Sequence, residues 1–318
     1  MSAPLRVLTL GESMGLLRGD GIGGFERLPA ASIDTGGAEG NTAVGLARLG
    51  VPVTWLGRVG DDALGRRVCG DLRAEGVDVL AITDPAAPTG LMLKSTPRAG
   101  TTVIEYYRAG SAGSRLTPAD LDRLDFAAYG IIHITGVTLA LSASARATVH
   151  EAVDRARAHG LLVSFAVNHR SKLWDRDRAR AAYLDLLPRV DIVFASDEEA
   201  ELVSRPSGAV PLAELARALG ALGPREAVVT LGDRGAIAEI DGAAHRIAAD
   251  KISPVDTVGA GDAFAAGYLA ARAAGHPAYE RLRVATRCGA FACLHPGDWQ
   301  GAARQSDLDQ GFGITVVR

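Results

Sequence analysis

Lysine is scarce in this sequence. Only Lys94, Lys172 and Lys251 occur among its 34 basic residues. None of them follows a glycine, so the glycine–lysine pair of a P-loop is absent and a P-loop nucleotide site is excluded. Cysteine is also rare. Its three residues, an odd number, give no disulfide framework and suit a reducing compartment such as the cytoplasm.

Long apolar runs are missing as well. The first residues, MSAPLRVLTLGES, lack the charged start and the long apolar run of a signal peptide. The longest apolar-looking stretch, 263–274, is short and contains Arg272, so we expect a core helix rather than a membrane span. A net charge of −3 gives no sign of a nucleic-acid partner. We therefore expect neither a membrane nor a nucleic acid among the partners.

The residues that are present predict an α/β fold. Hydrophobic residues make up 47% and charged residues 22% of 318, which is typical of a globular protein with a sizeable core. Short apolar and β-branched runs alternate with longer segments of helical spacing, and this predicts a mostly parallel central sheet flanked by helices. The expected strands are 7–10, 53–57, 131–135, 161–167, 192–194 and 228–231. The expected helices are 41–49, 142–159, 177–187 and 212–222, followed by a helical region from 259 to 294 with a break near 275–277.

Two regions interrupt this alternation and predict a small β-sheet lid. Residues 14–35 are glycine-rich and poorly periodic, and residues 89–110 contain the paired runs TGLMLKS and TTVIEYYR around a PRAG turn. We expect these two regions to form the lid, and 1–13, 36–88 and 111–318 to form the α/β body. Because a lid with apolar faces can pair with a second copy, a homo-oligomer through the lid is left open.

The segment Asp256–Asp262, DTVGAGD, predicts an anion site. Its two glycines permit a tight turn and a close approach to a ligand, and an alanine-rich helix follows. Such a turn presents free backbone N–H groups and the positive end of the helix dipole. A carboxylate at Asp262 could take a proton from an alcohol that attacks a phosphoryl group. Alternatively, Asp262 only caps the helix.

Two further glycine-rich turns predict ligand contacts. Gly36 and Gly37 precede Asn41 and an apolar helix, and an asparagine side chain can both donate to and accept from sugar hydroxyl groups. A tight turn with a helix cap is the simpler interpretation. The run Val228–Gly235, VVTLGDRG, indicates a buried strand that ends in a glycine-bounded turn, where ligands of an open α/β sheet bind.

Together these segments resemble the PfkB/ribokinase family of carbohydrate kinases. DTVGAGD is similar to the C-terminal signature of that family, and GGAEGN is similar to its N-terminal signature about 220 residues earlier. The stretch WLGRVGDDALGRRV also resembles the family pattern. The resemblance implies a ribokinase-like fold, an ATP-dependent phosphotransferase with an alcohol acceptor, Asp262 as catalytic base, and Gly259, Ala260 and Gly261 as the hole that holds the transferring phosphoryl group.

The same resemblance implies the sites for nucleotide and metal. TLGxxG matches the nucleotide loop of the family, which places Thr230, Gly232 and Gly235 near the ATP phosphates, with adenine near 285–290. The family's NxxE motif reads Ser196-Asp197-Glu198-Glu199, so Glu199 is expected to order the water shell of Mg²⁺. Mg²⁺ would arrive with ATP and keep waters. A requirement for a monovalent cation is left open.

The substrate is expected to be a sugar or a sugar acid. Tyr106 and Arg108 are two residues apart and share one face of a strand, where the ring suits sugar carbons and the guanidinium suits a carboxylate. YYRAGSAGSRL, VNHRSKLW and HPGDW are similar to 2-keto-3-deoxygluconate kinases. This implies that Tyr106 and Arg108 contact the substrate, with Gly36, Gly37 and Asn41, and that Arg170 lies between the substrate and the phosphates.

Three positions depart from those kinases, namely Ala166, Met92 and Ser196. The expected reaction is ATP-dependent phosphorylation of 2-keto-3-deoxygluconate to its 6-phosphate. Fructokinase, ribokinase and 5-dehydro-2-deoxygluconokinase are alternatives within the family, and a non-catalytic sugar-binding protein is an alternative on the same fold. A dinucleotide-dependent oxidoreductase would need GxGxxG after the first strand, and LTLGESMGLL does not supply it.

Overall fold

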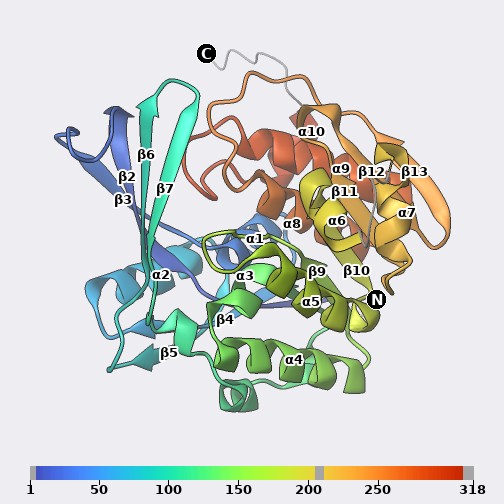
Figure 1. The fold of residues 1–318 in the computed structure, drawn as a ribbon, viewed down its shortest axis with the longest axis horizontal. Coiled ribbons are helices and arrows are strands. Elements are labelled where there is room, and N and C mark those ends of the chain that lie inside the picture. The colour runs from blue at the N-terminus through green and yellow to red at the C-terminus, as the bar shows by residue number, and fades with distance from the viewer. Residues whose placement is uncertain (1–4, 205–210, 311–318) are drawn as a thin grey trace.

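The computed structural model describes residues 5–204 and 211–310 (Figure 1). Residues 1–4, 205–210 and 311–318, which the sequence assigned to the α/β body, lie outside the described residues. The strands are β1 (Val7–Leu10), β2 (Met14–Ile22), β3 (Ala31–Gly36), β4 (Val53–Gly60), β5 (Asp78–Asp84), β6 (Leu91–Arg98), β7 (Thr101–Tyr107), β8 (Ile131–Thr135), β9 (Leu162–Ala166), β10 (Ile192–Ser196), β11 (Glu226–Thr230), β12 (Ala236–Ile240) and β13 (Ala243–Ile247).

The α-helices are α1 (Ala38–Arg48), α2 (Ala63–Ala74), α3 (Gly136–Leu141), α4 (Ala143–Ala158), α5 (Arg176–Leu186), α6 (Asp197–Ser204), α7 (Leu215–Gly220), α8 (Ala260–Ala273), α9 (Ala278–Ala292) and α10 (Gln305–Gln310). Short 3₁₀ helices cover η1 (Gly113–Arg115), η2 (Pro118–Arg123), η3 (Phe126–Ala128), η4 (Leu187–Arg189), η5 (Leu212–Glu214) and η6 (Gly232–Arg234). None of the described helices is both long enough and apolar enough to cross a membrane.

A nine-stranded sheet forms the body, in the order β13-β12-β11-β10-β9-β8-β1-β4-β5. From β11 to β5 every neighbouring pair is parallel, and β12 and β13 add an antiparallel edge. The strand order reverses beside β1, because the chain runs from β1 to β4 and β5 on one side and later continues from β8 on the other. Ligands of such sheets bind outside the carboxyl ends of the strands at this reversal.

Two hydrophobic cores, one on each face, hold the sheet between helices. Alternate strand residues enter opposite cores: Val7 and Ile131 join the core of α1, α8 and α9, whereas Leu8 and Ile132 join the core of α4 and α5. Successive strand side chains point to opposite faces, so a strand buried on both sides must be apolar throughout. The predicted α/β fold with a mostly parallel central sheet is confirmed.

The lid is a separate four-stranded sheet in the order β3-β2-β6-β7. It stands at the left of Figure 1, beside the body. Its apolar face gathers Met14, Leu16 and Met92, with Ile104 and Tyr106 packed against them. The predicted small β sheet is confirmed, and its strands lie within the two regions that the sequence proposed for it, except that β3 extends to Gly36, one residue beyond 14–35. The exact division into body and lid stays a prediction.

Candidate active site

The turn before α8 is shaped for close contact with a ligand. Gly259 adopts the left-handed conformation, with φ of +79°, and a Cβ at this position would overlap the carbonyl oxygen of Asp298. Only glycine fits both restraints. A Cβ on Gly261 would meet nothing within 4 Å, so the first turn of the helix faces open space. This geometry agrees with the anion site expected from Gly259, Ala260 and Gly261.

The N-terminus of α8 has no side-chain cap. In contrast, Asp62, Ser142 and Asp175 cap α2, α4 and α5 by accepting backbone N–H groups in the first turns of those helices. Backbone N–H groups in the first turn of a helix have no partner within the helix. At α8 they remain available, together with the positive end of the helix dipole, for an anionic phosphate.

Asp262 is held in place by two amide side chains. Asn41 Nδ2 donates to Asp262 Oδ2 at 2.8 Å, and Asn168 Nδ2 lies 3.4 Å from Oδ1. Burial raises the pKa of Asp262 to about 6, although the hydrogen bond from Asn41 and the charge of Arg170 both lower it. The carboxyl group is thus oriented, and its pKa suits a general base near neutral pH.

The predicted substrate residues surround one hollow. A cavity of about 290 Å³ adjoins a wider one of about 770 Å³, and the two share Ile104, Tyr106, Arg108 and Arg170. Predicted site residues that line the smaller cavity are Gly37, Asn41, Tyr106, Arg108, Arg170, Gly259, Gly261 and Asp262. Residues from the two signatures and from the lid therefore meet at one place, although they are far apart in the sequence.

Gly36 and Gly37 let the chain pass close to its neighbours. A Cβ on Gly37 would overlap the carbonyl oxygen of Glu12, and a Cβ on Gly36 would overlap Met92 and Asp298. The Gly37 N–H lies 3.3 Å from Asn41 Oδ1 and donates to it, which leaves Nδ2 of the same amide pointing at Asp262. The glycine pair therefore contributes to the orientation of Asn41. Direct contact of either glycine with substrate stays a prediction.

Arg108 already has a carboxylate partner inside the protein. Its Nε and Nη2 lie 2.7 and 2.5 Å from Glu12 Oε2, and the hydroxyl group of Ser111 donates to Oε1. The guanidinium also lies 5.4 Å from the ring centroid of Tyr106. Arg108 and Tyr106 share the cavity wall as expected, but Glu12 compensates the charge that the sequence assigned to a substrate carboxylate.

Arg170 lies on a loop that Glu199 anchors. The Glu199 carboxylate accepts the backbone N–H groups of His169 at 2.7 Å and Ser196 at 2.9 Å. Asn168, which precedes His169, has a φ of +40°, which is uncommon for a residue other than glycine. Glu199 therefore fixes the loop that carries Asn168 and Arg170. Its expected role in ordering the water shell of a metal stays a prediction.

The nucleotide residues lie at the same edge of the sheet but outside this cavity. Thr230 ends β11 and pairs with Ser196 at the end of β10. Gly232 and Gly235 have φ of +61° and +92°, and a Cβ on Gly235 would overlap the carbonyl oxygen of Ile247. Both glycines are thus required by the turn. The adenine position near 285–290 lies on α9, where most residues are buried, and remains a prediction.

Several residues of the site were not singled out from the sequence. Asp298 lines the cavity, and burial raises its pKa. Glu39 is fully buried, two residues before Asn41, the partner of Asp262. It accepts hydrogen bonds from Thr135 and Thr138, and burial raises its pKa to about 7. Asp298 belongs to HPGDW and Asn168 to VNHR, which the resemblance had already marked. Glu39 lies inside GGAEGN, but nothing in the neighbouring sequence indicates that its carboxyl group is buried.

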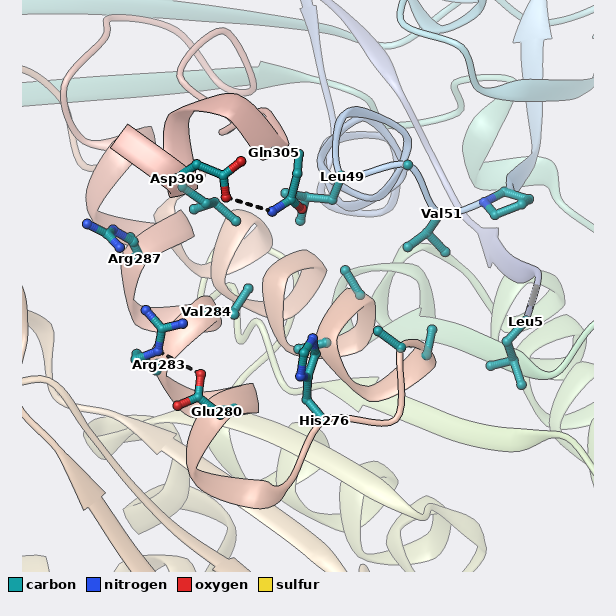
Figure 2. A pocket seen from close by; sticks show the side chains of 17 residues that line it. Leu5, Leu49, Val51, His276, Glu280, Arg283, Val284, Arg287, Gln305 and Asp309 are labelled. Atoms are coloured by element: carbon teal, nitrogen blue, oxygen red, sulfur yellow. Dashed lines mark hydrogen bonds and ion pairs between the residues drawn. The ribbon is translucent and has the colours of Figure 1, made fainter. Parts of the chain in front are cut away.

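A second hollow, of about 410 Å³, lies at the other end of α8 (Figure 2). It is lined by four alanines near the C-terminus of α8, by Leu49–Pro52 before β4, and by residues of α9 and α10 such as Val284 and Gln305. Ala270 is eight residues beyond Asp262, or ~12 Å along a helix. This hollow contains none of the residues expected for the site.

Within the described residues, no group of three or more His, Cys, Asp or Glu side chains could hold a metal ion. The residues present fit the phosphate groups of ATP, because the uncapped turn of α8 and the open space at Gly261 and Gly232 offer backbone N–H groups to an anion.

A glycine turn that suits phosphate and an oriented carboxylate, both beside a cavity next to a β lid, are features expected of a carbohydrate kinase. The chain belongs to the pfkB family carbohydrate kinases, whose family model matches residues 24–302. The family expected from the sequence is confirmed, as is its class, an ATP-dependent phosphotransferase acting on a sugar.

Relatives cover nearly the whole chain. It is 33% identical over 311 residues to the 2-dehydro-3-deoxygluconokinase of Bacillus subtilis (strain 168). The aligned region covers 96% of this chain and 94% of that protein. It is also 33% identical over 315 residues to the fructokinase of Klebsiella pneumoniae, with 96% and 99% covered. The crystal structure of fructokinase from Vibrio cholerae O395 in fructose, ADP and calcium ion bound form has a TM-score of 0.84 and 26% identity, over 96% of this chain and 98% of that chain.

The raised pKa of Asp262 predicts the pH dependence of turnover. A general base works in its ionised form, so kcat/KM should be constant above about pH 6 and should fall about tenfold per pH unit below it. In the wild type the hydrogen bond from Asn41 lowers the pKa of Asp262. Replacing Asn41 with Ala removes this bond, so the pKa should rise and the decline should move to higher pH. The measurement is kcat/KM from about pH 5 to about pH 9 at saturating Mg-ATP. A decline at one pH in both proteins would assign it to another group.

Proposed function

We propose that this carbohydrate kinase phosphorylates the terminal hydroxyl group of a sugar acid, with 2-keto-3-deoxygluconate as the preferred substrate and its 6-phosphate as the product. Bound ATP with Mg²⁺ supplies the phosphoryl group. Asp262 accepts the proton of the hydroxyl group as its oxygen bonds to phosphorus, and the turn at Gly259–Gly261 stabilises the negative charge of the transferring group. The arrangement of Asn41, Asp262 and the uncapped α8 turn supports this proposal most strongly.

An anionic substrate is favoured by the charges around the cavity. Arg170 lines both parts of the hollow, and within the described residues its side chain is hydrogen-bonded only to the backbone oxygen of His169. It can therefore pair with a carboxylate or a phosphate group. Tyr106 offers a ring for sugar carbons. The B. subtilis relative, which is a 2-dehydro-3-deoxygluconokinase, supports the same substrate, since this name denotes the same sugar acid.

A neutral ketose such as fructose is the second candidate. Glu12 compensates the charge of Arg108, so this part of the cavity offers less positive charge to a substrate carboxylate than the sequence suggested. The K. pneumoniae relative is a fructokinase of equal identity, 33%. Met92 lies in the lid core rather than offering a polar group to a substrate. These observations make fructose the second candidate substrate to be tested.

Cofactors, location and assembly form the rest of the proposal. Mg-ATP is the phosphoryl donor, with Thr230, Gly232 and Gly235 near its phosphates and Glu199 near the metal's water shell. The three cysteines are free thiols, which suits the cytoplasm.

Two copies would pair through the outer face of the lid, where large apolar side chains are exposed at Ile33, Val103 and Tyr107. We expect sedimentation to give a dimer and the change of Tyr107 to Glu to shift it to a monomer. A wild-type protein that sediments as a monomer at the assay concentration would contradict this assembly.

Replacing Asp262 with Asn should separate activity from stability. We expect kcat to fall by about 10²–10⁴, the usual contribution of a general base. Folding raises the pKa of Asp262 from 3.8 to about 6, so the folded state holds this proton more tightly than the unfolded state. The stability that the protonated carboxyl group contributes is therefore lost as the pH rises from 3.8 through 6. The variant, which carries no charge here, should melt at a higher temperature than the wild type at about pH 8, with a smaller difference at about pH 5. Asp185→Asn, an exposed carboxylate on α5, is the control. Near-normal turnover would remove Asp262 from its role.

A coupled ADP-release assay over neutral sugars and sugar acids tests the substrate. We expect the highest kcat/KM on 2-keto-3-deoxygluconate. Replacing Arg170 with Gln should lower that value by about 10²-fold, because a charge-assisted hydrogen bond is lost, and Arg170→Lys should lose less. The effect on fructose should be smaller by about tenfold, since only the phosphate contact is affected. Activity confined to neutral sugars would overturn the sugar-acid assignment and leave the kinase assignment intact.

A further inference from the structure

Lys94 is a buried lysine at the boundary between the lid and the body. It lies on lid strand β6, and only 4% of it is exposed. Lysine is almost never fully buried unless its ammonium group has partners. Here Nζ lies 2.6 Å from Asp256 Oδ2 and 3.6 Å from Asp298 Oδ1, and it donates to the carbonyl oxygen of Gly297 at 2.8 Å. All three partners belong to the body.

These partners build the turn in front of α8. Asp256 begins DTVGAGD, and its Oδ1 accepts the backbone N–H of Val258 at 3.2 Å. Its Oδ2 lies 3.3 Å from the backbone nitrogen of Gly297, which joins the turn to the segment after α9. The carbonyl oxygen of Asp298 lies directly against Gly259, the residue whose left-handed conformation starts the helix. The ammonium group thus sits where two backbone segments meet behind the anion site.

The charges at this place are unbalanced without the lysine. Asp256 and Asp298 are 9% and 7% exposed in their side chains, and both lie close to a site that must accept the negative charge of a phosphoryl group. Asp298 also acts on Asp262, whose pKa its negative charge raises. The charge of Lys94 lowers the pKa of Asp298, against the larger effect of burial. Two buried carboxylates without a cation would repel an incoming phosphate.

We propose that Lys94 is a positioning residue for phosphoryl transfer, which fixes the 256–259 turn and offsets one of the two negative charges of Asp256 and Asp298 beside the anion site. Lys94 does not contact the reacting atoms. It acts from the lid, so the catalytic turn is complete only when β6 lies against the body. The inference rests on the role of the α8 turn in the proposed function, but it does not depend on which sugar is the acceptor.

A charge-balance series tests this role. The variants are Lys94→Met, Asp256→Asn and the double variant. Lys94→Met should lower kcat/KM for Mg-ATP by about 10- to 100-fold, in the range of coupling between buried neighbours. The double variant restores the net charge of the cluster, and an asparagine at 256 can still accept from Val258. It should recover about tenfold or more of the lost activity. Lys251→Met, at an exposed lysine, should change kcat/KM less than about twofold.

The outcomes separate a positioning role from a purely structural one. If Lys94 only holds the fold together, Lys94→Met and its recovery by Asp256→Asn should change the melting temperature alone, because removing both partners of a buried ion pair also removes the unpaired charge. Normal kcat/KM in a folded Lys94→Met protein with a lower melting temperature would therefore overturn the proposal. So would a double variant whose kcat/KM shows no recovery. If Lys94→Met does not fold, Lys94→Gln keeps a donor for Gly297 and removes only the charge. It should show the same loss of kcat/KM and the same recovery with Asp256→Asn.

A second measurement separates this proposal from the proposed function. Binding of a non-hydrolysable Mg-ATP analogue that keeps the γ-phosphate, Mg-AMP-PNP, needs no acceptor sugar and is followed by the rise in melting temperature. The Lys94→Met variant should bind Mg-AMP-PNP more weakly than the wild type, and the double variant should regain binding. Wild-type protein that binds Mg-AMP-PNP but phosphorylates no sugar would contradict the proposed function alone. Equal binding of Mg-AMP-PNP by wild type and Lys94→Met, with equal kcat/KM, would contradict the role of Lys94 alone.

Discussion

The hydrogen bond from Asn41 to Asp262 is the interaction on which the site depends. It joins the N-termini of α1 and α8, which are 221 residues apart in the sequence, across a distance of 2.8 Å. Both helices pack in one hydrophobic core, and that packing sets the distance between the amide group of Asn41 and the carboxylate of Asp262. The bond can form only if the sheet, α1 and α8 are all correctly packed. Orientation of the Asp262 carboxylate therefore depends on the packing of the whole body rather than on a local motif.

Burial of carboxyl groups is the main electrostatic cost of this arrangement. Asp262, Asp298 and Glu39 all have pKa values raised chiefly by burial, and those of Asp262 and Glu39 reach about 6 and about 7. The protein offsets this with amide and hydroxyl donors and with the ammonium group of Lys94, rather than with an ion pair on Asp262 itself. A directly paired Asp262 would have a lower pKa and would be a weaker base, so distant compensation keeps the group reactive.

The sequence predicted the parts of the fold and site that have local patterns. Apolar runs such as Ile131–Thr135 located the buried parallel strands, and the two glycine signatures located Asn41 and Asp262. β2 looked aperiodic because its pairing with β3 and β6, not its own pattern, holds it as a strand. Helix 212–222 proved to be η5 followed by a shorter α7. Contacts such as Lys94–Asp256 have no local signal, since each partner looks like an ordinary charged residue until the fold joins them.

The lid is tied to the body by ion pairs at two separate places, and this constrains how it can move. Arg108, just beyond β7, pairs with Glu12 after β1, and Lys94 on β6 pairs with Asp256 before α8. Both pairs are buried, so opening the lid would expose or separate charges that each side has desolvated. The same pairs engage Arg108 and Lys94, whereas Arg170, on the loop that Glu199 holds, lines the cavity with its side chain hydrogen-bonded, within the described residues, only to the backbone oxygen of His169.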